Sequence, residues 1–142
     1  PEDVKLKFPI YIIQNPQEYK KYRTALSNSF IRWSFIQLAL GTIFMFHFFS
    51  TLHQQESTLN YFYGIFIMIH IFSFTLAMDQ SRYLIFTEII KLAFSLILIF
   101  IQKFSWFGLQ GNSIYMILFY LIISTTFTTY FSQKDKLILE PT

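Results

Sequence analysis

Apolar residues gather into four long segments that are separated by short polar stretches. The segments run from about residue 30 to 52, 60 to 78, 83 to 102 and 113 to 131. Each holds roughly 19 to 23 residues, which at 1.5 Å per residue crosses a hydrocarbon core of about 30 Å. Their apolarity is continuous rather than alternating, which favours helices over strands. The pattern predicts an all-α polytopic membrane protein with four transmembrane helices and short loops.

The scarcity of charge inside these segments supports the same prediction. Only 13% of the 142 residues are charged, whereas a soluble domain carries about 25%. The basic residues flank the apolar segments, so the net charge of +3 does not indicate nucleic acid as a partner. The expected partners are membrane lipids, and either a preceding catalytic domain or neighbouring membrane subunits. Six charged residues lie between Trp33 and Gln133: Glu56, Asp79, Arg82, Glu88, Lys91 and Lys103.

The chain is expected to divide into three parts. Residues 1–29 form a polar connector that either lies on the membrane surface or is a plain linker. Residues 30–132 form the four-helix transmembrane module, and residues 133–142 form a cytoplasmic tail. Because the sequence starts at Pro1 rather than Met, we expect a fragment or a processed product.

Lysine and arginine counts predict the orientation in the membrane. The segment through Arg32 carries six, the turn from Asp79 to Arg82 one and the tail two, while the two loops on the other side together carry only Lys103. Basic residues concentrate on the cytoplasmic side, so both termini are expected there. Aromatic residues near the segment ends are expected to form an interfacial belt: Trp33, Tyr61, Tyr63, Tyr83 and Trp106.

Two charged residues stand inside the third segment, where each costs about 2.5 to 3.5 kcal/mol on insertion scales. Glu88 and Lys91 are three positions apart and can pair on one helix face. We therefore expect an intramembrane ion pair that faces the helix bundle or a neighbouring domain. The alternative is a polar spot lining a lipid-headgroup or proton path. In the preceding turn, which ends at Arg82, Asp79 is expected to cap the third helix by accepting backbone N–H bonds.

Small and hydroxylated residues recur at helical spacing in the first and fourth segments. In a membrane such residues mark helix–helix contacts, because close approach and interhelical hydrogen bonds replace the missing hydrophobic drive. The predicted contact positions are Gln37, Gly41, Thr42, Ser124, Thr125, Thr128 and Thr129.

The three histidines do not have the spacing of a metal site. Imidazoles that share a metal from one helix face stand three or four positions apart, and no two of His47, His53 and His70 do. His47 and His70 also differ in membrane depth by roughly 6 Å. The chain has no cysteine, so it offers no thiolate ligand. We therefore expect no catalytic, cofactor or metal site within this chain.

Several short motifs occur in an order that resembles one family. A Ser/Thr-containing helix end, the turn Asp79–Arg82 and a helix with Glu88 and Lys91 follow one another. Upstream stand Pro1-Glu2-Asp3-Val4, then Lys7-Phe8-Pro9, Tyr19-Lys20-Lys21-Tyr22, Ile36-Gln37-Leu38 and Leu40-Gly41-Thr42. From Pro1 to about Ile101 this series resembles the region after the catalytic domain in alkylglycerol monooxygenase and sterol desaturase-like proteins of the fatty acid hydroxylase superfamily.

The resemblance implies a C-terminal transmembrane module that anchors and shields a catalytic domain preceding it. Enzymes of that family bind two irons through His-x3-His and His-x2-His-His clusters and oxidise lipids with oxygen. This chain has none of these clusters, so the di-iron centre is expected in the preceding domain. The alternative is a small non-catalytic accessory or assembly subunit of a larger membrane complex.

Overall fold

The computed structural model describes residues 26–139, and most of them are helical. The helices are α2 (Asn28–Thr51), α3 (Ser57–Met78), α4 (Leu84–Ile101) and α5 (Asn112–Leu139). Each is long and apolar enough to cross a membrane, and α4 is both the shortest and the most apolar of these spans. The prediction of an all-α, four-span membrane protein is confirmed.

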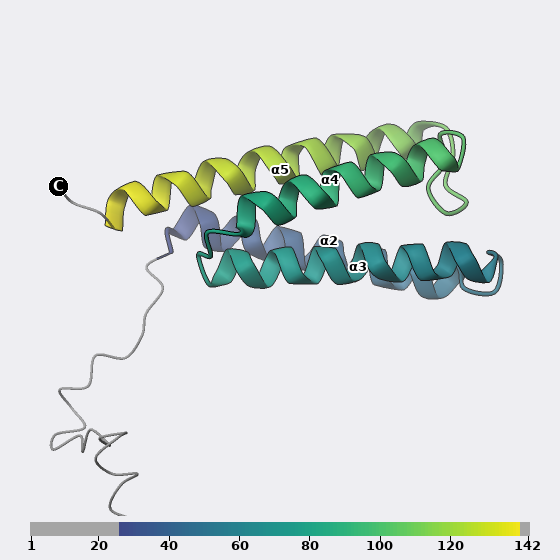
Figure 1. Ribbon diagram of the computed structural model, residues 1–142, viewed down its shortest axis with the longest axis horizontal. Coiled ribbons are helices and arrows are strands. Elements are labelled where there is room, and N and C mark those ends of the chain that lie inside the picture. Colours follow the sequence, from purple (N-terminus) through teal and green to yellow (C-terminus); the bar gives the residue numbers. More distant parts are fainter. Residues whose placement is uncertain (1–25, 140–142) are drawn as a thin grey trace, which may run out of the picture.

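The helices form an antiparallel bundle of two layers, α2 with α3 and α4 with α5 (Figure 1). Helices that follow one another in sequence pack together, and α5 also packs on α2 to close the bundle. The turn between α3 and α4 lies at the same end as the C-terminal end of α5, and the α2–α3 and α4–α5 loops lie at the opposite end (Figure 1).

The helix boundaries agree with the sequence prediction to within three residues, except at the C-terminal end of α5. Helix α2 begins at Asn28, where the Ser27 hydroxyl accepts a hydrogen bond from the Phe30 amide at 3.2 Å and caps the helix. Helix α5 continues to Leu139, so it includes much of the segment predicted as a tail. The predicted connector lies almost wholly outside the described residues.

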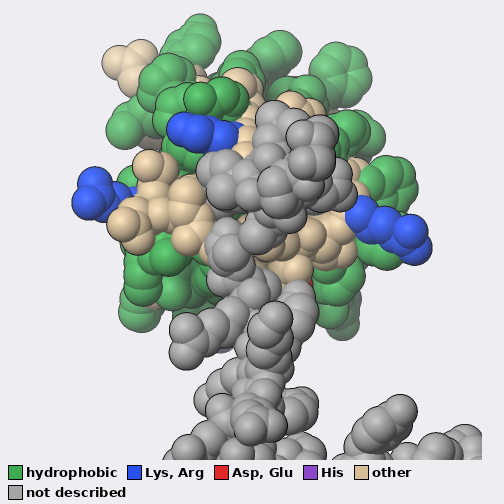
Figure 2. All heavy atoms as spheres, turned by 90° about the vertical axis from the view of Figure 1, so that its left-hand side faces the viewer, with side chains coloured by type: hydrophobic (Ala, Val, Ile, Leu, Met, Phe, Trp, Pro, Cys, Tyr) green, Lys and Arg blue, Asp and Glu red, His purple; other side chains and the backbone are tan. Residues whose placement is uncertain are grey.

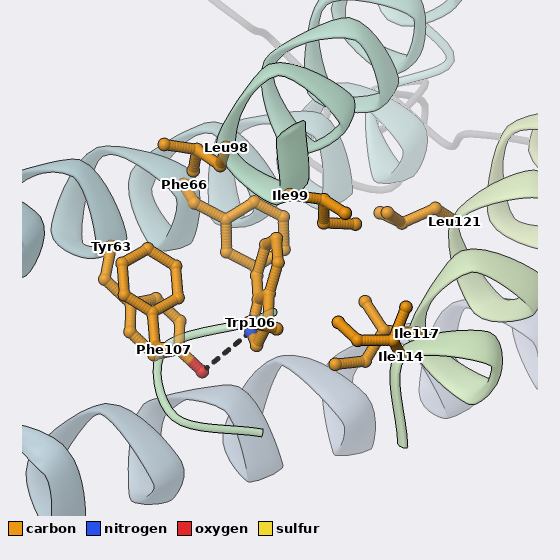
Figure 3. Packing of buried hydrophobic residues seen from close by; sticks show 9 residues of the cluster. All are labelled: Tyr63, Phe66, Leu98, Ile99, Trp106, Phe107, Ile114, Ile117 and Leu121. Carbon is orange, nitrogen blue, oxygen red and sulfur yellow. Dashed lines mark hydrogen bonds between the residues drawn. The ribbon is translucent and has the colours of Figure 1, made fainter. Parts of the chain in front are cut away.

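Two apolar clusters fill the ends of the bundle. The smaller one lies near the α3–α4 turn and consists of Phe30, Trp33, Ala77 and Leu84. The larger one, which we call the aromatic end, lies toward the α2–α3 and α4–α5 loops and is drawn in Figure 3. It comprises Tyr63, Phe66, Leu98, Ile99, Trp106, Phe107, Ile114, Ile117 and Leu121.

A tight hairpin in the loop between α4 and α5 folds two aromatic rings into the aromatic end. Trp106 and Leu109 exchange two backbone hydrogen bonds of 2.9 Å. The residues between them, Phe107 and Gly108, have φ angles of 44° and 94°, as a two-residue hairpin turn requires. Such a conformation is unfavourable for phenylalanine, but the Phe107 ring is fully buried and stacks on Tyr63 at 4.1 Å between centroids.

The predicted interfacial belt is wrong for three of its five residues. Trp33, Tyr63 and Trp106 are at most 7% exposed and lie in the bundle interior. Their polar atoms find partners there, since Trp33 Nε1 donates to Thr128 Oγ1 at 2.9 Å and Trp106 Nε1 to the Tyr63 hydroxyl at 3.4 Å (Figure 3). Only Tyr61 and Tyr83 keep exposed rings, as a belt requires.

Candidate functional site

A layer of buried polar side chains separates the two apolar clusters. All four helices contribute to it, and none of its side chains is more than 3% exposed. A polar group buried without a partner is costly, so the hydrogen bonds of this layer determine what it can do. We call it the polar layer, and it consists of Gln37, His70, Ser73, Glu88, Lys91, Ser124 and Thr128.

The charged pair lies at the centre of the polar layer. Lys91 Nζ is 2.7 Å from Glu88 Oε1, and both side chains are 1% exposed. The Ser73 hydroxyl of α3 donates to the same carboxylate oxygen at 2.5 Å, and the Ser124 hydroxyl of α5 donates to the other at 3.3 Å. Lys91 also donates to Ser124 at 2.9 Å. The pair expected from the sequence is therefore formed, and it faces the bundle interior and ties α4 to both neighbouring helices.

Helix α2 joins this network through an amide. Gln37 Nε2 donates to the Ser124 hydroxyl at 3.0 Å and to the Thr128 hydroxyl at 2.7 Å. Because Trp33 also donates to Thr128, two side chains of α2 converge on one face of α5. The polar layer thus connects all four helices around the ion pair.

A histidine and a glycine fit together where α2 and α3 cross. His70 Nε2 lies 3.1 Å from the Gln37 backbone carbonyl, which only accepts, so Nε2 carries the proton. The other ring nitrogen lies 3.3 Å from the Tyr120 hydroxyl. A Cβ atom at Gly41 would come within 2.7 Å of the His70 ring, so this contact requires glycine.

The histidines do not assemble a metal site in the part of the chain that the structure describes. No group of three or more His, Asp or Glu side chains there could hold an ion. Both nitrogens of His70 have protein partners, His47 Nδ1 is bonded to the Tyr63 hydroxyl at 2.8 Å, and His53 stands exposed in a loop. The residues present therefore do not fit a di-iron centre.

Asp79 does not cap α4, the third helix in chain order, contrary to the sequence prediction. It is instead the last residue associated with α3, and its amide donates to the Thr75 carbonyl at 3.1 Å. Gln80 has a φ of 50°, and the Ser81 amide bonds the Leu76 carbonyl, which together close α3 in a Schellman motif. Helix α4 begins only after Tyr83 and has no side-chain cap.

The predicted helix-contact positions divide into two groups. Gln37, Gly41, Ser124 and Thr128 lie at helix–helix contacts, as expected. The hydroxyls of the other three donate instead to carbonyls four residues earlier in their own helices, as isolated hydroxyls in apolar surroundings do. These three are Thr42, Thr125 and Thr129.

Sequence reasoning missed Ser73 and Tyr120 as members of this network. Ser73 is three positions after His70 and therefore shares its helix face, which was the available signal. Tyr120 precedes Ser124 by four positions on α5 in the same way. Comparisons with known protein families, with curated proteins and with solved structures find no match.

The arrangement as a whole holds the four helices together. Both carboxylate oxygens of Glu88 and the ammonium of Lys91 are occupied by contacts to neighbouring side chains. A charge pair that is enclosed and hydrogen-bonded in this way fixes which helices are neighbours, a use well attested for buried polar groups.

Proposed function

We propose that the chain is the transmembrane module of a sterol desaturase-like lipid oxygenase, in which it anchors and shields a di-iron catalytic domain that precedes it. The proposal rests on the ordered resemblance from Pro1 to about Ile101. One observation supports a scaffolding role: the pair Glu88–Lys91 bonds Ser73 and Ser124 on the adjoining helices and is almost fully buried. Its bonds serve the assembly of the bundle.

The exterior of the bundle suits an anchor. Large apolar side chains are exposed along all four helices, including Phe35, Met68, Phe100 and Phe119, each 66% exposed or more. Figure 2 shows hydrophobic side chains around the sides of the bundle and Lys and Arg side chains at the rim of the end that carries the α3–α4 turn. Such a surface is matched to hydrocarbon at the sides and to headgroups at the rim.

The proposed orientation places this basic rim, and both termini, in the cytoplasm. Arg32, Arg82 and Lys134 are exposed at this end, whereas the opposite loops carry Lys103 and Glu56. Single cysteines at Ser57 and Gly111 should react with an impermeant thiol reagent added outside intact cells, and a cysteine at Ser81 should not. Labelling at position 81 from outside would contradict this orientation.

Extending the polypeptide upstream of Pro1 tests the function itself. The extended protein should contain His-x3-His and His-x2-His-His clusters, bind iron and oxidise a long-chain lipid in the presence of oxygen and a reductant. Residues 1–142 alone should bind no stoichiometric iron, and His47→Ala or His70→Ala should leave the iron content of the extended protein unchanged.

A different outcome would support the second candidate. An upstream sequence without histidine clusters, or a reading frame that begins within a few residues of Pro1, would make the chain an accessory or assembly subunit. Copurification of a larger membrane complex with the intact chain would then be expected.

A further inference from the structure

A groove on the outside of the bundle runs between α3 and α4, next to the turn that joins them. It has a volume of about 350 Å³, and apolar side chains of both helices form its walls. Phe72 and Phe86 stand at its two sides and are 57% and 63% exposed. The Thr87 hydroxyl in the wall donates to the Leu84 carbonyl at 2.8 Å and so offers no free donor to the groove. The groove is therefore suited to a hydrocarbon chain.

A cation is held at the mouth of this groove. Tyr83 lines the groove at the start of α4 and is 54% exposed. Arg82 Nη2 donates to the Tyr83 hydroxyl at 3.0 Å, and the guanidinium carbon lies 5.0 Å from the centre of the Tyr83 ring. These two contacts fix the guanidinium beside the groove, and the rest of its donors point to no carboxylate, because the only ion pair in the described part of the chain is Glu88–Lys91.

We propose that this groove binds an anionic phospholipid, with one acyl chain between α3 and α4 and the phosphate on Arg82. From Leu76 at the mouth to Ile69 at the inner end the groove follows α3 for about 10 Å, which places its inner end within the hydrocarbon core. A guanidinium matches a phosphate with two parallel hydrogen bonds, and the headgroup region is where a phosphate lies. The proposal is independent of the proposed function, since it needs only the membrane and these residues.

Native mass spectrometry of the intact chain tests the proposal. Released from detergent with added phosphatidylglycerol, the chain should retain one lipid, and phosphatidylcholine with the same acyl chains should be retained less. Arg82→Gln should weaken phosphatidylglycerol binding about fivefold, because one basic residue at an anionic surface contributes about that factor. Arg82→Lys keeps the charge but not the two parallel hydrogen bonds, so it should recover only part of the preference for the anionic lipid.

Two matched pairs of variants separate this groove from general lipid contact. Ile90→Trp fills the groove and should abolish retention of the lipid, whereas Met45→Trp, in the groove between α2 and α3, should not. Lys103→Gln removes an exposed cation at the opposite end of the bundle and should leave binding unchanged. Helix content measured by circular dichroism would show that each variant is folded.

Three results would overturn the proposal. The first is equal retention of the two lipids, and the second is a loss on Lys103→Gln as large as that on Arg82→Gln. The third is a second copy of the chain in the groove, seen as efficient disulfide-linked dimers of Phe72→Cys in lipid vesicles.

Discussion

The polar layer and the aromatic end fill neighbouring parts of the same bundle by different physical means. In the polar layer, short hydrogen bonds join named atoms, such as Lys91 Nζ to Glu88 Oε1 at 2.7 Å. At the aromatic end, rings fit by shape, as where Phe66 meets Trp106 edge-on with 4.8 Å between centroids. Lipid chains are as apolar as these rings, so burial of rings alone hardly favours protein over lipid. The comparison indicates that the polar layer determines which helices become neighbours, whereas the aromatic end fills the space between them.

The largest expected effect comes from removing one member of the ion pair. Lys91→Met keeps the size of the side chain but leaves the Glu88 carboxylate unpaired, which should lower the free energy of unfolding by about 3 to 5 kcal/mol. Adding Glu88→Gln to Lys91→Met should restore most of the lost free energy of unfolding, because the Gln side chain can still accept the hydrogen bond from Ser73. Unfolding in bicelles by added SDS measures both variants.

Ile89→Met is the matched control, since Ile89 adjoins the pair but is 54% exposed on the outer face. A double variant as unstable as Lys91→Met would show that the pair does not act as a unit. A double variant of the whole protein that is well folded but inactive would assign the pair to function rather than to assembly.

A smaller effect is expected where α2 and α3 cross. Gly41→Ala places a Cβ 2.7 Å from the His70 ring and should cost about 1 to 3 kcal/mol by displacing that ring. Gly64→Ala is the control, because nothing lies within 4 Å of its Cβ position. Alanine also favours a helix over glycine, so Gly64→Ala should stabilise by up to about 1 kcal/mol. If Gly41→Ala and Gly64→Ala change the free energy of unfolding in SDS by the same amount, the close fit between Gly41 and His70 would be contradicted.

Removing a single hydroxyl of the polar layer is expected to lower the free energy of unfolding by less than the changes at Lys91 and Gly41. Ser124→Ala removes contacts with Gln37, Glu88 and Lys91, and interhelical hydrogen bonds in membranes contribute about 0.6 to 1.7 kcal/mol. Thr126→Ala, whose hydroxyl is exposed and bonds only its own helix, should have almost no effect. If the two variants unfold at the same SDS concentration, the contacts of Ser124 contribute nothing measurable.

The smallest effect is expected at the aromatic end. Ile99→Leu keeps the volume and the apolar character of a side chain that is only 3% exposed and gives up no hydrogen bond, so the loss should stay below about 1.5 kcal/mol. The same unfolding assay compares it with Ser124→Ala. A loss larger than that of Lys91→Met would reverse the proposed division of roles between the two regions.

Much of the fold could be predicted because a membrane span leaves a strong signal. Continuous apolarity over about 20 residues identifies each helix, and the spacing of Glu88 and Lys91 predicts their contact within one helix. The remaining contacts of the polar layer depend on which helices become neighbours. Nothing local in the sequence states that Ser73 of α3 meets Glu88 of α4.

Two of the incorrect predictions, for Asp79 and for Trp106, have related causes. Asp79 was assigned to α4 because capping was judged from residue type, whereas the left-handed Gln80 and the Schellman bonds attach it to α3. Trp106 was placed at the interface because it stands near a span end, whereas the hairpin turns its ring back into the bundle. In both cases a backbone with positive φ at a residue other than glycine decided the outcome, and sequence patterns rarely reveal such residues.

The composition of α4 bears on how the chain enters a membrane during synthesis. Its thirteen Leu, Ile and Phe residues contribute roughly 4 to 8 kcal/mol in favour of insertion. Glu88 and Lys91 oppose this by about 5 to 7 kcal/mol when counted as separate charges near the centre of a span. The two contributions nearly balance, and pairing within the helix reduces the second. We therefore expect α4 to stand close to the limit of independent insertion, where the Glu88–Lys91 pair lowers the cost before Ser73 and Ser124 complete their hydrogen bonds.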